Sequence, residues 1–391
     1  MAYFSSQEYE KRVAKVREIL EPRKLDFALI YYDEFNLANA WYLTGWCPQF
    51  ESGSVLVPLK GEPLILGGPE SEPFAKMDCA ITQTRNLPVF MVPDEEYPNA
   101  TIMSFAELFK ELSGSGPVRR AGIVGAGQMP MSVYRQIEES FHGVEMVDIT
   151  EEYLRLRYIK SPWELAQMRQ AFLLADDTYE AMRKAVRPGA HEYEVAAVGE
   201  FEARRRGANN FAFKAIVGSG KRANAVVPTA GDKVMEAGEM VMLGLAPRYN
   251  GYAGVFGHTV PVNGEATKAQ AECLKHLREV FSLTKEKLVV GTVGREVDAP
   301  GRKYFIDHGF MKYLVCPFAH TVGINEAEAP FFGPHSKDVV QPGMAISVDV
   351  SFFGHPVLNG VRVETAYQIT ERGPVPFSPR MDKLLSREEQ G

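Results

Sequence analysis

Two stretches near the end of the chain place acidic side chains where they can do chemistry. In AISVDVSFF, residues 345–353, and in GVRVETAYQ, residues 360–368, side chains alternate as they do in β-strands. A hairpin turn through GHPVLNG pairs Asp349 with Glu364, with Cβ atoms about 5 Å apart. Carboxylates that close repel each other unless one is protonated or a cation lies between them. The pair therefore predicts a functional site, and the alternative is a solvated strand face on which both acids are harmless.

Two histidines and one arginine accompany these acids. His320 lies in the apolar segment CPFAHTVG, and His258 follows a glycine in FGHTV. Either ring can transfer protons or can be a hydrogen-bonded structural residue. Arg362, two residues before Glu364, can bind an anion or orient that carboxylate. These residues by themselves indicate only an enzyme-like protein with a carboxylate pair.

The first 155 residues are expected to form an α/β domain. Short apolar runs at 27–32, 54–59, 63–68 and 121–125 alternate with helical stretches near 36–44, 102–113 and 130–140. Such alternation is typical of helices packed on a largely buried sheet.

A second domain is expected from residue 156 to residue 391. Ser161-Pro162-Trp163-Glu164 combines a capping serine, a proline in the first turn and a glutamate that closes a capping box. Apolar residues then recur at spacings of three and four up to Val186, which predicts a long amphipathic helix. Further helices are expected near 191–206 and 267–288, and hairpins at Asn250-Gly251 and across 345–368. Together these elements indicate an α+β domain.

Composition narrows the range of functions. The chain has 391 residues, 43 Lys and Arg against 50 Asp and Glu, and a net charge of −7. This balance predicts no nucleic-acid partner and no membrane surface as a partner. The four cysteines are widely separated, as in a reduced cytoplasmic protein, and Cys316 in its apolar run is expected to be an inert buried thiol.

Several ordered motifs resemble one family. The chain is similar to the creatinase/aminopeptidase P family, whose catalytic domain has the pita-bread fold. The resemblance implies a pita-bread catalytic domain after a smaller creatinase-type N-terminal domain. The matching segments are LRLRYIKSPWELAQMRQAFLLADDTYEAMRKAVRPGAHEYEVAA, VGSGKRAN, GEMVMLGLAPRYNGYAGVFGHTVPV, AHTVGINEAEAP, PGMAISVDVS, GVRVETAYQIT and, upstream, AWYLTGW.

The metal site of the family is altered in this chain. Peptidases of the family hold two divalent metals with two Asp, one His and two Glu. The resemblance places the His at His320 and the two Glu at Asp349 and Glu364, but the two Asp at Gly244 and Val255. Two further family histidines fall at Val227 and Ala327, and His258 stands where the peptidases usually have Arg.

We therefore expect no dinuclear metallopeptidase, because Gly244 and Val255 offer no side-chain oxygen to a hard cation. The expected function is that of a metal-independent, cofactor-free, creatinase-like hydrolase of a C–N bond in a small molecule. The predicted catalytic residues are His320, Glu364, Asp349 and His258. Three alternatives remain open: a metal-independent lyase acting on an apolar or aromatic molecule, a non-catalytic binding protein, and one metal ion held by one His and two carboxylates.

A cleft with an apolar lining is expected to bind the small-molecule substrate. The alternative for its aromatic residues is an ordinary place in the core. The resemblance further implies a homodimer in which N-terminal-domain residues of one protomer complete the cleft of the other. The predicted substrate-binding residues are Arg362, Tyr252, Val255, Gly244, Phe211 and Phe213, with Trp46 and Phe50 contributed across the dimer.

Overall fold

The structure of the protein is a computed structural model that describes residues 5–93, 96–113 and 117–387. The chain divides into two compact units, Met1–Arg157 and Tyr158–Gly391. Among the described residues, no helix combines the length and the apolarity needed to cross a membrane.

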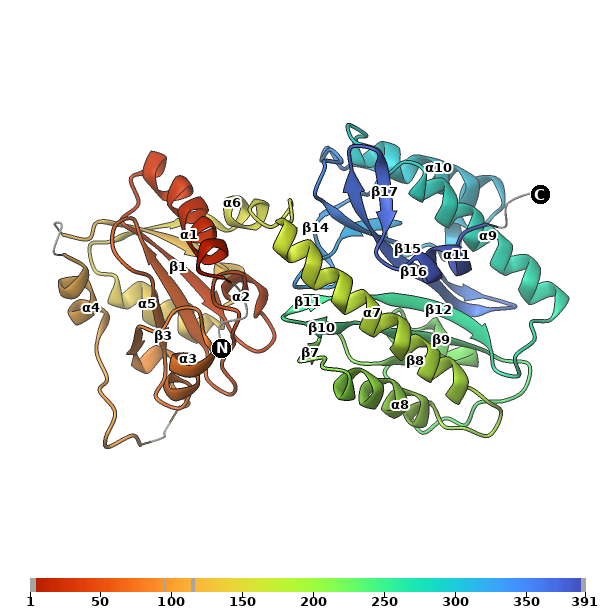
Figure 1. Cartoon of the computed structure of the whole chain (residues 1–391), viewed down its shortest axis with the longest axis horizontal. Helices are drawn as coiled ribbons and strands as arrows, with labels where there is room; N and C mark the ends of the chain where they lie inside the picture. The colour runs from red at the N-terminus through yellow and green to blue at the C-terminus, as the bar shows by residue number, and fades with distance from the viewer. Residues whose placement is uncertain (1–4, 94–95, 114–116, 388–391) are drawn as a thin grey trace. The chain divides into compact units, whose positions relative to one another are not determined.

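The first unit is built on a six-stranded mixed sheet with the strand order β4-β3-β2-β1-β5-β6 (Figure 1). Central strand β1 is buried along its whole length and pairs antiparallel with β2 and parallel with β5. Its strands are β1 Phe27–Tyr32, β2 Gly53–Pro58, β3 Leu64–Gly67, β4 Thr84–Asn86, β5 Arg120–Val124 and β6 Glu145–Asp148. Its helices are α1 Ser6–Leu20, α2 Ala38–Thr44, α3 Glu72–Asp78, α4 Phe105–Leu112, α5 Met131–Ser140 and α6 Thr150–Arg155.

The second unit is built on a larger, antiparallel sheet with the order β14-β13-β15-β16-β12-β9-β8, and β17 pairs with β16. A smaller three-stranded sheet has the order β11-β10-β7. The strands are β7 Asn210–Phe211, β8 Ile216–Ser219, β9 Met240–Leu245, β10 Pro247–Tyr249, β11 Tyr252–Ala253, β12 Phe256–Pro261, β13 Ala319–Thr321, β14 Glu328–Phe331, β15 Ala345–His355, β16 Asn359–Thr370 and β17 Gly373–Pro376. The helices are α7 Pro162–Ala185, α8 Glu192–Arg205, α9 Lys268–Lys285, α10 Gly294–Asp307 and α11 Pro379–Leu385.

The long helix α7 begins where the sequence predicts it. The Ser161 hydroxyl accepts from the Glu164 backbone N–H while the Glu164 carboxylate accepts from the Ser161 N–H, so two otherwise unpaired donors are satisfied. Met168, Phe172 and Tyr179 on its apolar stripe are buried. The helix is thereby fixed against the sheet, as Figure 1 shows.

The two faces of the large sheet differ in chemistry. Val348, Val350 and Val363 point into the main core, which helices α7, α9 and α10 complete. Because side chains alternate along a strand, Asp349 and Glu364 point to the opposite face, called here the carboxylate face. One β-sheet thus separates the apolar core from the polar site.

The expected fold class is confirmed: a smaller α/β domain precedes an α+β domain with an antiparallel sheet. The Asn250-Gly251 turn also forms as predicted, with positive φ at both residues. The prediction missed helix α10, because Pro300 and Gly301 lie inside it and normally interrupt helices.

Candidate metal-binding active site

The hairpin β15–β16 brings the two predicted carboxylates together. Asp349 is the direct cross-strand partner of Glu364, as the alternation of the two sequences predicts. His320 on β13 pairs with Ser347 on the other side of β15. Ligand atoms of His320, Asp349 and Glu364 all lie within 4.8 Å of one another, and all three residues are buried.

His320 presents its Nε2 atom to this cluster. Its Nδ1 lies 3.0 Å from the backbone oxygen of Thr321, which can only accept a hydrogen bond. Nδ1–H is therefore the donor, and Nε2 of the neutral ring keeps its lone pair. Nε2 lies 3.9 Å from Oε1 of Glu364. This is the arrangement in which an imidazole binds a metal ion through one nitrogen while the other is held by a carbonyl.

The cluster contains a third carboxyl group, Glu326, that the sequence analysis missed. Its Oε1 lies 3.4 Å from Nε2 of His320, and its carboxyl group is hydrogen bonded to that of Glu364. Two carboxyl groups can share a hydrogen bond only when one of them carries a proton. Burial, followed by the charge of Asp349, raises the pKa of Glu364 well above its usual range, and burial also raises the pKa of Glu326.

A weak signal for Glu326 is present in the sequence NEAEAP, where Glu326 and Glu328 alternate with alanines. In a strand, residues two apart point to the same face, so this alternation places both acids on one side and does not distinguish between them. In the structure Glu326 precedes β14 and approaches His320, whereas Glu328 is on β14, where its Oε2 lies 3.5 Å from Nζ of Lys160 in a buried ion pair.

Arg362 is positioned against Asp349. Its Nε lies 3.2 Å from Oδ1 of Asp349, yet among the described residues neither atom has a hydrogen-bond partner of good geometry. The stem of Arg362 crosses Gly257 on the neighbouring strand, where an added Cβ would lie 2.7 Å from the Arg362 Cδ. Arg362 thus lies beside the acids, its predicted role in substrate binding stays a prediction, and the glycine opposite Glu364 makes room for its stem.

The row of side chains that contains the acids ends in two glycines. Asp349 pairs with Glu364, Glu364 with Gly257, and Gly257 with Gly244 on β9. Gly244 contributes no oxygen, and Val255 is fully buried directly before β12. The side chains that could bind a cation are thus concentrated at the β13–β15–β16 end of the row.

His258 does not join this cluster, which corrects its predicted catalytic role. It follows Gly257 on β12, so its ring points to the opposite face of the sheet and pairs across the strands with Val363. There its Nδ1 lies 2.7 Å from the hydroxyl of Tyr179 on α7. The sequence alone does not show whether His258 lies near Glu364, because this depends on the register of β12.

The three aromatic residues predicted to line the cleft do not lie together. Tyr252 is buried, and its hydroxyl donates to Glu164 at 2.8 Å, so it fixes the start of α7. Phe211 lies under the guanidinium of Arg204, 4.9 Å from its ring centroid, and packs on the helical core. Only Phe213 packs with residues of the carboxylate face, Ile216 and Met242 among them.

Trp46 and Phe50 lie in the first unit. Trp46 packs edge-on against Tyr32, and Phe50 is 87% exposed. Their contact with a partner's cleft remains a prediction. In the second unit, the thiol of Cys316 lies 3.4 Å from the hydroxyl of Ser351, and burial raises its pKa to about 11, as expected for an unreactive thiol.

The cluster fits one divalent cation. It offers one imidazole nitrogen and carboxylate oxygens, and Oδ1 of Asp349 is a buried oxygen still lacking a hydrogen bond. Three carboxylates and one guanidinium give a local charge of −2 when the shared proton is lost. That charge balances one dication and leaves a second one uncompensated.

The chain is similar to known peptidases along nearly its whole length. The model of metallopeptidase family M24 matches residues 166–371, and that of the creatinase/prolidase N-terminal domain matches residues 12–159. A Xaa-Pro dipeptidase of Pyrococcus horikoshii is 26% identical over 93% of this chain and 95% of its own length. An uncharacterised peptidase of Bacillus subtilis, YqhT, is 30% identical over 63% of this chain and 69% of its own.

Solved structures have the same fold. The prolidase from Pyrococcus horikoshii superimposes with a TM-score of 0.80 at 23% identity, covering 94% of this chain and 97% of that one. The X-Pro aminopeptidase from Thermotoga maritima gives a TM-score of 0.81 at 19% identity, covering 94% and 97%. The expected creatinase-type domain followed by a pita-bread catalytic domain is thereby confirmed.

The predicted function, in contrast, is not confirmed. A metal-independent, creatinase-like hydrolase or lyase was expected from Gly244 and Val255. That expectation is wrong, because the catalytic domain matches a family of metallopeptidases and full-length relatives are named Xaa-Pro dipeptidases. The absence of acidic side chains at Gly244 and Val255 leaves the other ligand residues, His320, Asp349 and Glu364, in place, and these can still hold an ion.

Proposed function

Because the chain belongs to metallopeptidase family M24, with a creatinase/prolidase N-terminal domain ahead of its catalytic domain, we propose that it is a metal-dependent hydrolase of peptide bonds in dipeptide-sized substrates. The observation that carries the proposal is the convergence of ligand atoms from His320, Asp349 and Glu364 within 4.8 Å. A bound divalent ion supplies Lewis acidity, which polarises a scissile carbonyl group.

The side chains have separate roles in this proposal. His320 binds the ion through Nε2, and Asp349 and Glu364 bind it through carboxylate oxygens. Arg362 is a positioning residue, since its guanidinium lies against Asp349 and holds that carboxylate in place. Burying the ion among these groups strengthens every electrostatic interaction at the site.

Glu326 is assigned to proton transfer. Its side chain is 19% exposed, whereas that of Glu364 is 2% exposed, so Glu326 is the acid that a substrate can reach. Its carboxyl group shares a proton with Glu364 in the absence of an ion. With the ion bound and this proton lost, the Glu326 carboxylate can accept a proton from the attacking water and pass it to the departing amine.

We propose one ion per chain rather than two. The family resemblance places Gly244 and Val255 at the positions where its peptidases have two acidic ligands, and neither side chain offers an oxygen. The charge of the cluster, −2 with all three carboxylates ionised, supports the same stoichiometry. In this respect the chain would depart from the two-metal pattern that its family resemblance implies.

The proposed substrate class is Xaa-Pro dipeptides. Support comes from full-length relatives named Xaa-Pro dipeptidase, at 26% identity. An apolar cluster on the carboxylate face, formed by Phe213, Ile216, Met242 and Phe353, is suited to a compact apolar ring such as that of proline.

Release of proline tests the proposal. The full chain is loaded with Mn²⁺, Co²⁺ or Zn²⁺ and incubated with Ala-Pro and Leu-Pro, with Pro-Ala as the reversed control. Hydrolysis that stops on chelation and returns with the ion is expected. His320→Ala should abolish it, whereas His335→Ala, an exposed histidine of the same domain, should not. Equal rates before and after chelation would overturn the proposal.

A further inference from the structure

His258, which the candidate active site leaves out, lies at the bottom of a separate hollow on the helical side of the sheet. The hollow has a volume of about 830 Å³ and is bounded by β12, α7, α9 and α11. We propose that this hollow binds a small organic phosphate. Its volume lies within the range of about 300–1,000 Å³ that is typical of small-molecule sites.

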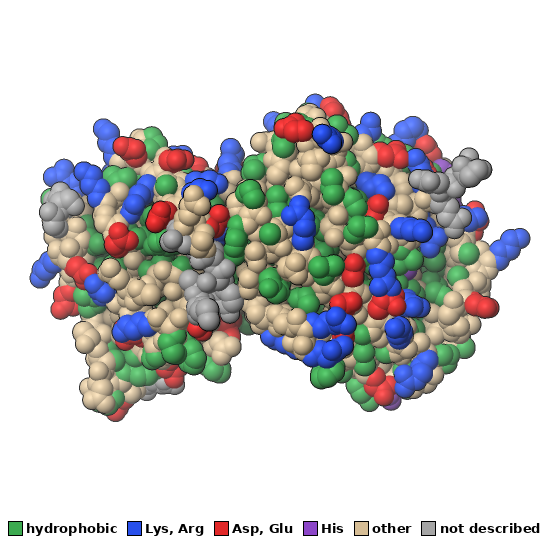
Figure 2. All heavy atoms as spheres, viewed as in Figure 1, with side chains coloured by type: hydrophobic (Ala, Val, Ile, Leu, Met, Phe, Trp, Pro, Cys, Tyr) green, Lys and Arg blue, Asp and Glu red, His purple; other side chains and the backbone are tan. Residues whose placement is uncertain are grey.

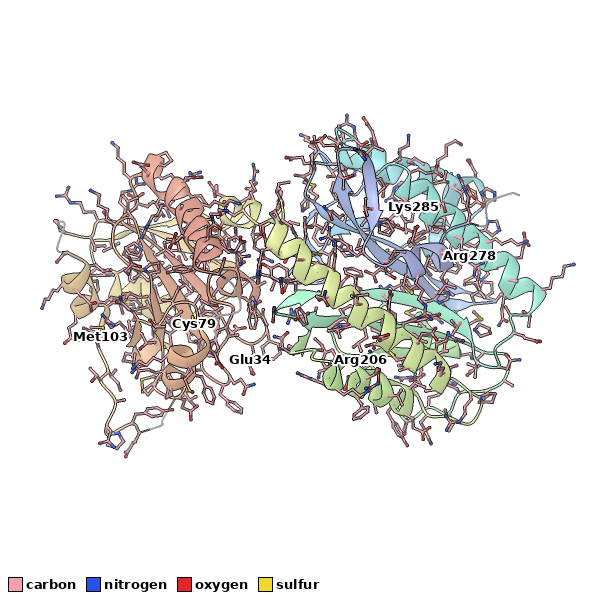
Figure 3. The ribbon with its side chains drawn as sticks, in the orientation of Figure 1. Glu34, Cys79, Met103, Arg206, Arg278 and Lys285 are labelled. Carbon is pink, nitrogen blue, oxygen red and sulfur yellow. The ribbon has the colours of Figure 1, made fainter. Side chains whose placement is uncertain are left out.

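The walls of the hollow carry an excess of positive charge. Figure 2 shows Lys and Arg side chains on this face of the second unit, and Arg278, labelled in Figure 3, comes from α9. Five cationic side chains stand against one carboxylate in a chain whose net charge is −7. The cationic residues are Arg183, Lys184, Arg278, Arg380 and Lys383, and the acid is Glu180.

Glu180 orients two of these cations. Its Oε1 lies 3.1 Å from Nε of Arg183 and also contacts the guanidinium of Arg380. One carboxylate thus holds guanidiniums from two helices, α7 and α11, at the same wall. Glu180 repels an incoming anion, but the five cations outnumber it. Guanidinium groups bind the oxygens of both phosphates and carboxylates in pairs, but a phosphate monoester carries more negative charge and more acceptor oxygens, so it satisfies more of the five cations than a single carboxylate does.

A polar pair forms the floor. His258 is 7% exposed, and its Nδ1 is hydrogen bonded to the Tyr179 hydroxyl at 2.7 Å. Burial, followed by the charges of Arg278 and Arg183, lowers the pKa of His258 to about 3, so the ring is neutral at physiological pH. When Tyr179 donates to Nδ1, the Nε2–H becomes a donor for a ligand oxygen.

The remaining wall is apolar and suits the organic part of the ligand. Val186, Val260, Pro261 and Leu384 line the hollow beside the charged groups. A neighbouring hollow of about 580 Å³ shares His258, Val260 and Arg278 and adds Lys275, Arg387 and Glu279, the last two of which form an ion pair. The two together leave room for a ligand larger than inorganic phosphate.

Calorimetric titration of the metal-free full chain with inorganic pyrophosphate tests this inference. Metal-free protein is used because pyrophosphate would also bind an ion in the active site. We expect saturable binding that weakens about tenfold or more in Arg278→Gln and in Lys383→Gln, since each loses a charge-assisted contact. Lys303→Gln removes an exposed charge on α10, outside the hollow, and should bind like the unchanged chain.

Two results would overturn the inference. One is absence of saturable binding, or equal binding in both hollow variants and in Lys303→Gln. The other is citrate binding as tightly as pyrophosphate, which would indicate a polycarboxylate site. Lys383 is exposed, so its variant remains informative if Arg278→Gln fails to fold. His320 does not line the hollow, so His320→Ala should bind pyrophosphate as tightly as the unchanged chain does. The pyrophosphate titration therefore gives the same result whether or not the chain is a peptidase.

Discussion

Glu364→Gln should weaken metal binding far more than it weakens the fold. In the metal-free chain Glu364 is hydrogen bonded to Glu326 across a shared proton. Glutamine has the shape of a protonated glutamate and can donate to Glu326 in its place. The free energy of unfolding of the metal-free variant should therefore equal or exceed that of the unchanged chain, because a buried carboxylate with a strongly raised pKa has been removed.

The cost to metal binding follows from the charge of the site. A unit charge and a dication about 4 Å apart interact by about 8 kcal/mol at an effective dielectric constant of 20. The amide oxygen and the avoided desolvation of the carboxylate recover part of this. Removing one partner of a buried charge pair typically costs about 2–5 kcal/mol. We therefore expect the Kd for the ion to rise by about 30- to 5,000-fold.

Competition with a fluorescent chelator, with Mn²⁺ or Zn²⁺, measures this Kd, and elemental analysis gives the stoichiometry. Glu296→Gln serves as the control because this glutamate is 57% exposed on α10, away from the cluster. Unfolding of each variant in urea checks the fold. A Kd unchanged within threefold in Glu364→Gln, or two equally tight ions per chain, would refute the assignment of the site.

Three further outcomes are expected. Glu326→Gln should lower kcat for Xaa-Pro hydrolysis by about 10²–10⁴ while shifting the Kd of the ion less than Glu364→Gln does; equal kcat would remove Glu326 from proton transfer. Metal affinity should fall as pH drops below the raised pKa of the Glu326–Glu364 pair, by about tenfold per pH unit, because the ion must displace one proton; a flat profile in calorimetry would contradict this. Gly257→Ala should destabilise the chain by about 1–3 kcal/mol in urea, because its Cβ would meet the Arg362 stem at 2.7 Å, whereas Gly244→Ala, with ordinary 3.4 Å contacts, should be neutral or stabilising.

Local patterns were enough to predict much of the fold. The capping box at Ser161 and the stripe of buried residues predicted α7, since both depend only on neighbours along the chain. The period-two alternation of β15 and β16 predicted that Asp349 and Glu364 are partners. Helix α10 was missed because its interior Pro300 contradicts local propensity, and packing of Val297 and Phe305 into the core overrides that propensity.

Local patterns along the chain were sufficient to predict two domains and to single out three residues that cluster, His320, Asp349 and Glu364. Tertiary structure decided what accompanies them. The register of β12 turns His258 away from the acids, and the path of the loop after β13 turns Glu326 toward them. A strand's face depends on which neighbour it pairs with, and a loop's direction depends on contacts distant in sequence, so neither can be derived from local spacing.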